Sequence, residues 1–161
     1  MFDGNPGLPD AAHFDAGPDA FFPPEDVPTN GADVFRYLQA GSYLSLEAES
    51  AVHDSTGPHG QPGVRTFINA ALAEGLANGG PHPVGAAAIK ELYRSDGTTL
   101  MGWAVSVKTD PDSAGGQGWY WYEVFSTTNG SNPVADGNGV GLCHGCHSGG
   151  QDYILTPYPL Q

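Results

Sequence analysis

Four stretches of the chain alternate apolar and polar residues with the two-residue period of a β-strand. Residues 64–69 place Val, Thr and Ile on one side and Arg, Phe and Asn on the other. Residues 100–107 place Met, Trp and two Val on one face, and residues 86–93 are the third stretch. Residues 119–127 place Trp119, Trp121, Glu123 and Phe125 on one face. Segments rich in Gly, Asp and Ser separate the later strands, as hairpin connections do. The pattern predicts an antiparallel sheet.

Residues 33–38 carry apolar side chains at helical spacing, and Gly41 follows as a stop signal. Glycine and proline make up 24 and 14 of the 161 residues, so long uninterrupted helices are not expected. The predicted fold class is therefore mainly β, of the α+β type, with an antiparallel sheet and a few short helices.

The first 31 residues differ in composition from the rest. They hold six prolines, four glycines and six acidic residues, with no basic residue before Arg36. Such a segment has little apolar surface to bury, so we expect an acidic tether over residues 1–31 and one domain over residues 32–161. The alternative is that this segment folds against the domain through Phe14, Phe21 and Phe22.

The charge of the chain restricts its partners. Five basic and eighteen acidic residues give a net charge of −13, which argues against nucleic acid or anionic lipid as the main partner. The longest apolar run is far shorter than eighteen residues, so no transmembrane segment is expected.

The two cysteines carry the most specific signal. Residues 143–147 read C-H-G-C-H, which is the attachment motif of c-type haem. Cys143 and Cys146 would bond the porphyrin, and His147 would bind the iron as the proximal ligand. The alternatives are weaker: a thioredoxin-like motif needs a βαβ context, four zinc ligands within five residues are crowded, and a disulfide leaves His147 unexplained. We expect one covalent haem c near the C-terminus, on a helix or loop.

The sequence does not identify the sixth ligand of the iron. Met101 shares a predicted strand face with Trp103, which is typical of a core residue rather than a ligand. His53 and His59 lie in a loop rich in Gly and Pro, and either of them could cap the iron. Without such a cap the iron is five-coordinate and open to small ligands.

Lys90 is unusual because it shares a predicted strand face with Ala86, Ala88 and Leu92. Small alanines would allow a flat macrocycle to lie close to this strand. The alternative is a lysine that extends from the sheet edge and pairs with Glu123 of a neighbouring strand.

Four features in order resemble the cytochrome P-460 family, which includes the β-type cytochromes c′. They are V-R-T-F at 64–67, A-I-K-E-L at 88–92, the aromatic strand at 119–125 and the haem motif near the end. The resemblance implies a small β-sheet protein, commonly a homodimer, with one high-spin haem c and hydroxylamine oxidation as the activity of some members.

The resemblance also implies roles for individual residues. Lys90 matches a lysine that is covalently bonded to the porphyrin, and Arg65 matches an arginine of the distal pocket. Phe67 is the nearest candidate for the phenylalanine that covers the open face in the β-type cytochromes c′. Asp136 is the acid nearest to the distal carboxylate that precedes the first haem cysteine.

The sequence therefore leaves three candidate functions. The first is oxidation of hydroxylamine, with electrons passing to a redox carrier protein. The second is binding of nitric oxide or carbon monoxide, and the third is electron transfer by a six-coordinate iron. Because haem c is attached outside the cytoplasmic membrane, we expect a periplasmic or extracellular location. The acidic tether resembles a lipoprotein spacer.

Overall fold

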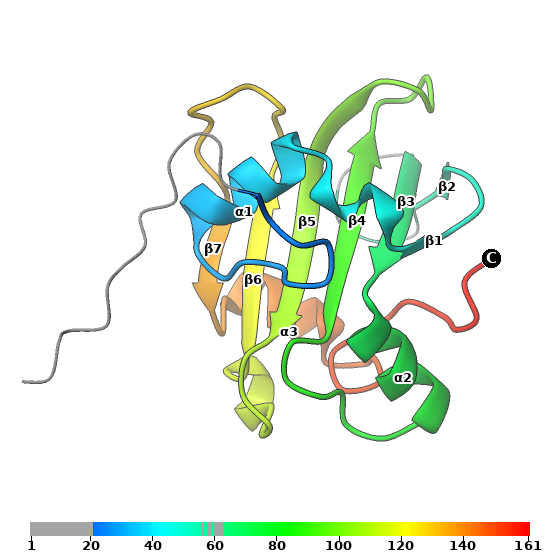
Figure 1. Ribbon diagram of the computed structural model, residues 1–161, viewed down its shortest axis with the longest axis vertical. Helices are drawn as coiled ribbons and strands as arrows, with labels where there is room; N and C mark the ends of the chain where they lie inside the picture. Colours follow the sequence, from blue (N-terminus) through cyan, green and yellow to red (C-terminus); the bar gives the residue numbers. More distant parts are fainter. Residues whose placement is uncertain (1–20, 56, 58, 60–62) are drawn as a thin grey trace, which may run out of the picture.

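The computed structural model describes residues 21–55, 57, 59 and 63–161. Its centre is an antiparallel seven-stranded sheet in the order β1-β3-β4-β5-β6-β7, with β2 paired to β3 (Figure 1). The strands are β1 (Glu47–Ala48), β2 (His53–Asp54), β3 (Gly63–Ile68), β4 (Ala87–Tyr93), β5 (Leu100–Lys108), β6 (Trp119–Val124) and β7 (Ala135–Asn138). The α-helices are α1 (Gly31–Gln39), α2 (Ala70–Asn78) and α3 (Gly141–His147), and short 3-10 helices span Ser42–Ser45 and Ala114–Gly116. The mainly β, α+β fold class is confirmed at this level.

Each face of the sheet carries its own hydrophobic core. One core lies under α1 and includes Phe67, Ile89, Trp103 and Tyr122. In Figure 1 this helix crosses one face of the sheet, whereas α3 lies on the other side of the strands. The second core joins that other face to α2 and to the C-terminal segment, and Trp119 is fully buried in it. Because side chains alternate along a strand, this division fixes which residues can meet α3.

The four long strands match their predictions closely. β6 ends at Val124, three residues before the predicted end, and β3 ends at Ile68 because Asn69 caps the next helix. The Asn69 side chain accepts a hydrogen bond from the Leu72 N–H, which is a typical N-cap contact. Helix α2 and the short strands β1, β2 and β7 were not among the predicted elements.

Met101 does not join the core beneath α1. Leu92 pairs with Gly102 and Tyr93 pairs with Leu100, so Met101 is the extra residue of a β-bulge. Leu100 packs against the core instead, and Met101 is only half-buried. The bulge therefore breaks the alternation that the sequence analysis extended to this residue.

The domain begins before Ala32, where the sequence analysis placed its boundary. Phe22 packs against the core beneath α1, Val27 belongs to that core, and Tyr37 donates a hydrogen bond to the Pro24 carbonyl. The backbone carbonyl of Glu25 accepts a hydrogen bond from Asn69. Residues 1–20 of the predicted tether (residues 1–31) lie outside the described residues, and the last third of that segment is part of the folded domain.

Candidate haem site

A cavity of about 500 Å³ lies between the sheet and the C-terminal segment. Its floor is made of strand residues, among which Ala88, Ala104 and Ser106 have small side chains that leave room above the sheet. A volume of this size falls in the range of about 300–1,000 Å³ that is usual for cofactor sites. The mouth is apolar, with exposed side chains at Phe125, Val134, Leu142 and Leu155.

The cysteine motif opens into this cavity from α3. Cys143, Cys146 and His147 all line it, because positions i, i+3 and i+4 share one side of a helix. Both cysteines are free thiols, Cys143 half-buried and Cys146 exposed. Burial raises the pKa of the Cys143 thiol to about 11, and the charge of Glu123 adds to the shift. The two thiols and the imidazole therefore face the same space.

The His147 imidazole is held in one orientation. Its Nδ1 donates to the Tyr153 carbonyl at 2.9 Å, and its ring centroid lies 4.9 Å from that of Trp121. Since a carbonyl only accepts, Nδ1 carries a proton, and in the neutral ring Nε2 keeps its lone pair. Burial lowers the pKa of His147, and the Lys90 ammonium adds to this effect. A neutral imidazole with a free Nε2 is the form that binds iron.

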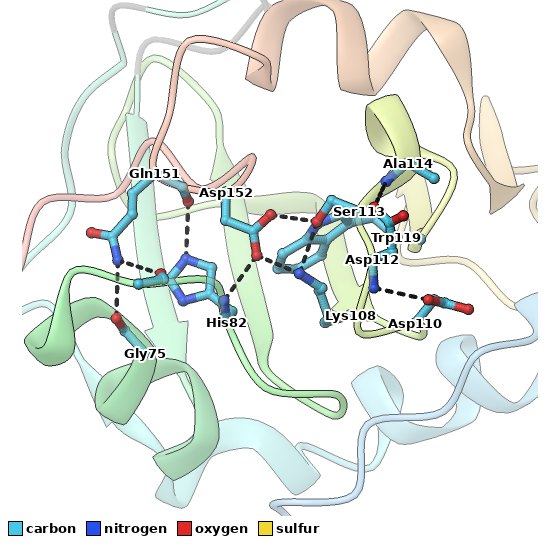
Figure 2. A network of polar contacts seen from close by, with 12 residues as sticks. Gly75, His82, Lys108, Asp110, Asp112, Ser113, Ala114, Trp119, Gln151 and Asp152 are labelled. Atoms are coloured by element: carbon cyan, nitrogen blue, oxygen red, sulfur yellow. Dashed lines mark hydrogen bonds and ion pairs between the residues drawn. The ribbon is translucent and has the colours of Figure 1, made fainter.

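A buried polar network fixes the segment that carries the Tyr153 carbonyl (Figure 2). Asp152 forms an ion pair with the fully buried Lys108, accepts from the Ser113 hydroxyl and accepts from the His82 backbone N–H at 2.8 Å. Asp152 and Tyr153 have φ angles of 44° and 71°, in a left-handed region that side chains disfavour. The network therefore stabilises a strained turn, and the Tyr153 carbonyl of this turn orients His147.

The neighbouring side chains extend this network toward α2. His82 bonds the Gln151 carbonyl through Nε2 at 2.9 Å, and the Gln151 side-chain amide donates to the Gly75 and Gly80 carbonyls. Figure 2 shows His82 between Gln151 and Asp152. The C-terminal segment is thus bonded to α2 as well as to the sheet.

Lys90 lies on the cavity floor and is half-buried. It belongs to a cross-strand row that runs from Thr66 through Lys90 and Ala104 to Glu123. Burial lowers its pKa, and the carboxylates of Glu49 and Glu123 oppose this shift. In the part of the chain that the structure describes, no hydrogen bond or ion pair holds its ammonium group. The Lys90–Glu123 pair, the alternative considered for this lysine, is not formed among the described residues, where β5 separates the two strands and Glu123 accepts a hydrogen bond from His59.

Glu123 forms a hydrogen bond with His59, a contact that the sequence did not predict. Its Oε1 accepts from the His59 Nδ1 at 2.6 Å, and both side chains line the cavity. Alternation along the aromatic strand already put Glu123 on the same face as Trp121. The position of His59 depends on a loop, which periodicity does not reach. Glu123 is thus one of the carboxylates that face the predicted haem site, together with Glu49 and Asp54.

Three residues implied by the resemblance lie on the other face of the sheet. Phe67 is buried in the core beneath α1, and the Arg65 guanidinium lies over its ring at 5.0 Å. The Asp136 carboxylate accepts from the Tyr120 hydroxyl at 2.5 Å, also on that side. The expected placement of all three in a distal pocket is therefore wrong for this cavity, since their strands point them away from it. Within the cavity, Phe125 is the phenylalanine and Glu123 is a carboxylate.

One buried donor in the cavity lacks a partner. The Trp121 Nε1–H is buried and makes no hydrogen bond within the described residues. Buried indole N–H groups are normally hydrogen-bonded, so this donor is available to an acceptor on a group bound in the cavity. The carboxylates of a haem are acceptors of that kind. The free thiols, the His147 Nε2, the small side chains of the floor and this indole N–H together fit a bound haem.

The described residues contain neither a metal site built from protein ligands alone nor a membrane-spanning helix. No three His, Cys, Asp or Glu side chains converge there as a protein-only metal site, so the zinc alternative gains no support. No helix described here is long and apolar enough to span a membrane.

Neither a protein-family model nor a curated protein matches the chain.

Proposed function

We propose that the protein is a c-type cytochrome with one haem in this cavity. Cys143 and Cys146 hold the porphyrin, and His147 binds the iron. The observation that carries the proposal is that these three side chains meet in one cavity of cofactor size, with His147 already oriented through Nδ1. When bound, haem c supplies an iron that takes up and releases single electrons.

The substrate class that we propose is small nitrogen compounds, with hydroxylamine first. The support is Lys90, which lies on the cavity floor and matches, by sequence resemblance, the porphyrin-bonded lysine of the resembling enzymes. Burial lowers the pKa of this lysine, which favours the neutral, nucleophilic amine. Glu123 gives the cavity a carboxylate that can accept protons from a bound nitrogen compound. A redox carrier protein would then receive the electrons.

Electron transfer without substrate chemistry is a second candidate. The observation that favours it is His59, which faces the same cavity as His147 with a ring-centroid distance of 6.2 Å. An iron bound by two histidines is suited to carrying electrons. Gas binding keeps less support, because Phe67 is absent from the cavity and only the half-exposed Phe125 takes its place.

Both candidates are tested on the full chain expressed with a c-type haem maturation system. We expect one haem per chain that resists extraction with acidified acetone, and we expect it to be lost from a Cys143→Ala, Cys146→Ala variant. Hydroxylamine oxidation is then measured with an artificial electron acceptor, with Lys90→Arg as the matched variant that keeps the charge but changes the amine. Haem that extracts freely from the wild type would refute the proposal. Stable haem without hydroxylamine oxidation would favour the electron carrier.

The remaining proposals concern location and assembly. We place the protein in the periplasm or outside the cell, because haem c is attached there. We also propose a homodimer, on the resemblance alone. Size-exclusion chromatography with light scattering tests the dimer, and fractionation of cells that express the native gene tests the location.

A further inference from the structure

Two imidazole rings from distant parts of the chain face the same cavity. His59 lies in the loop between β2 and β3, whereas His147 ends α3. Their ring centroids are 6.2 Å apart and their planes differ by 69°. A metal–imidazole bond is about 2 Å long, so two rings on opposite sides of one iron have centres about 6 Å apart once the ring radius is included. The observed separation suits one metal ion between the rings.

The two rings are also held in the same way. His147 donates through Nδ1 to the Tyr153 carbonyl, and His59 donates through Nδ1 to the Glu123 carboxylate. Neither Nε2 has a hydrogen-bond partner in the described part of the chain, and in the neutral tautomer with the proton on Nδ1 each Nε2 offers a lone pair. Metal-binding histidines usually have this arrangement, with the second nitrogen bonded to a carbonyl or a carboxylate.

His53, in the same region, is not available for this role. Its Nδ1 lies 2.9 Å from the Asp54 carbonyl, and its Nε2 lies 3.0 Å from the Glu49 carboxylate. Both nitrogens are thus occupied, and the side chain is 52% exposed against 17% for His59. Met101, the remaining sixth-ligand candidate from the sequence, does not line the cavity. His59 is therefore the candidate that has both the position and a free nitrogen.

We propose that His59 binds the haem iron as the sixth ligand, opposite His147, in the resting protein. The inference rests on the proposed haem attachment, and it specifies what controls the access of small ligands to the iron. Small ligands such as carbon monoxide or hydroxylamine bind only after His59 leaves the iron. Glu123 positions the ring, so removing its charge loosens the cap without removing the ligand.

The test uses the haem-loaded full chain and its absorption and electron paramagnetic resonance spectra. The ferric wild type is expected to be low-spin, and His59→Ala is expected to become high-spin. His53→Ala is the matched control and stays low-spin. Added imidazole returns His59→Ala to the low-spin state, which also shows that the variant is folded.

Carbon monoxide binding to the ferrous protein gives a second readout. In the wild type the rate reaches a limit set by His59 release, whereas in His59→Ala it rises linearly with concentration and is at least ten-fold faster. Glu123→Gln is expected to raise the limiting rate while the resting iron stays low-spin. A high-spin wild type, or a low-spin His59→Ala without added imidazole, would overturn the inference while covalent haem attachment still stands. Failure of haem attachment would instead refute the proposed function itself.

Discussion

The Lys108 ammonium and the Asp152 carboxylate form an ion pair inside the domain, between the last residue of β5 and the turn that follows α3. The Lys108 side chain is fully buried, and that of Asp152 is 14% exposed. Tyr153, the next residue in the chain, provides the carbonyl that orients His147. The pair therefore connects the stability of the sheet to the geometry of the proposed iron ligand.

Removing one charge of this pair is expected to be costly. Asp152→Asn leaves the Lys108 charge buried without compensation, which lowers the free energy of unfolding by about 3–5 kcal/mol. A Lys108→Met, Asp152→Asn double variant loses less than the sum of the two single variants, because neither charge then remains unpaired. Equilibrium urea unfolding measures all three. Glu74→Gln, an exposed position on α2, is the control and changes the value by less than about 0.5 kcal/mol. Additive losses would show that the pair is not energetically coupled.

His82 makes the stability depend on pH. Burial lowers its pKa below the ordinary value, although the Gln151 carbonyl and Asp152 oppose the shift. As the pH falls through about 6.5, the unfolded chain takes up a proton at this residue and the folded chain does not. Stability therefore decreases toward acid, by at most about 1.4 kcal/mol per pH unit from this residue. His82→Gln is expected to reduce the slope of unfolding free energy between pH 7 and pH 5. An unchanged slope would mean that His82 titrates alike in both states.

The alternation of side chains made much of this sheet predictable. It placed Lys90 and Glu123 on strands and put Trp121 and Glu123 on one face, which the structure confirms. It also put Arg65 and Phe67 on the face opposite to Thr66, but the resemblance assigned them to the haem side. Local alternation was the better guide here, because two-residue periodicity fixes the face whatever the family.

The parts that could not be predicted depend on loops and distant contacts. A glycine- and proline-rich loop gives no periodic signal for the position of His59. The bulge at Met101 appears only when β4 and β5 are paired, since the extra residue is defined by its partner strand. The buried Lys108–Asp152 pair joins residues far apart in the chain, so no local pattern indicates it.

The opposite placement of Phe67 and Phe125 gives a direct comparison. Phe67→Leu is expected to cost about 1 kcal/mol of stability and to leave the haem spectrum and the carbon monoxide affinity unchanged. Arg65→Ala likewise leaves both unchanged, because Arg65 does not line the cavity. Phe125→Leu, at the mouth of the cavity, is expected to change the carbon monoxide affinity. Spectral changes in Phe67→Leu as large as those in Phe125→Leu would restore the distal role that the resemblance implies.

Lys90 decides between an enzyme and an electron carrier. Its amine lies on the cavity floor in one row with Ala104 and Glu123, and burial lowers its pKa. A covalent bond from this nitrogen to a porphyrin carbon replaces one N–H and one C–H bond and requires a two-electron oxidant such as a peroxide. It would disturb the conjugated ring and move the ferrous absorption to longer wavelength than in ordinary haem c. We therefore expect the wild type to show a red-shifted band and Lys90→Ala to lack it.

Peptide mapping by mass spectrometry gives an independent measurement of the same bond. In the wild type, the peptide that contains Lys90 is expected to be joined through haem to the peptide of Cys143 and Cys146. Lys90→Arg is the control, since it keeps a positive charge at the same place on β4 but cannot form the same lysine bond. If wild type and both variants give one ordinary haem-c spectrum, the cross-link is absent. Hydroxylamine oxidation then loses its main residue-level support, and electron transfer through an iron bound by His59 and His147 becomes the better description of the site.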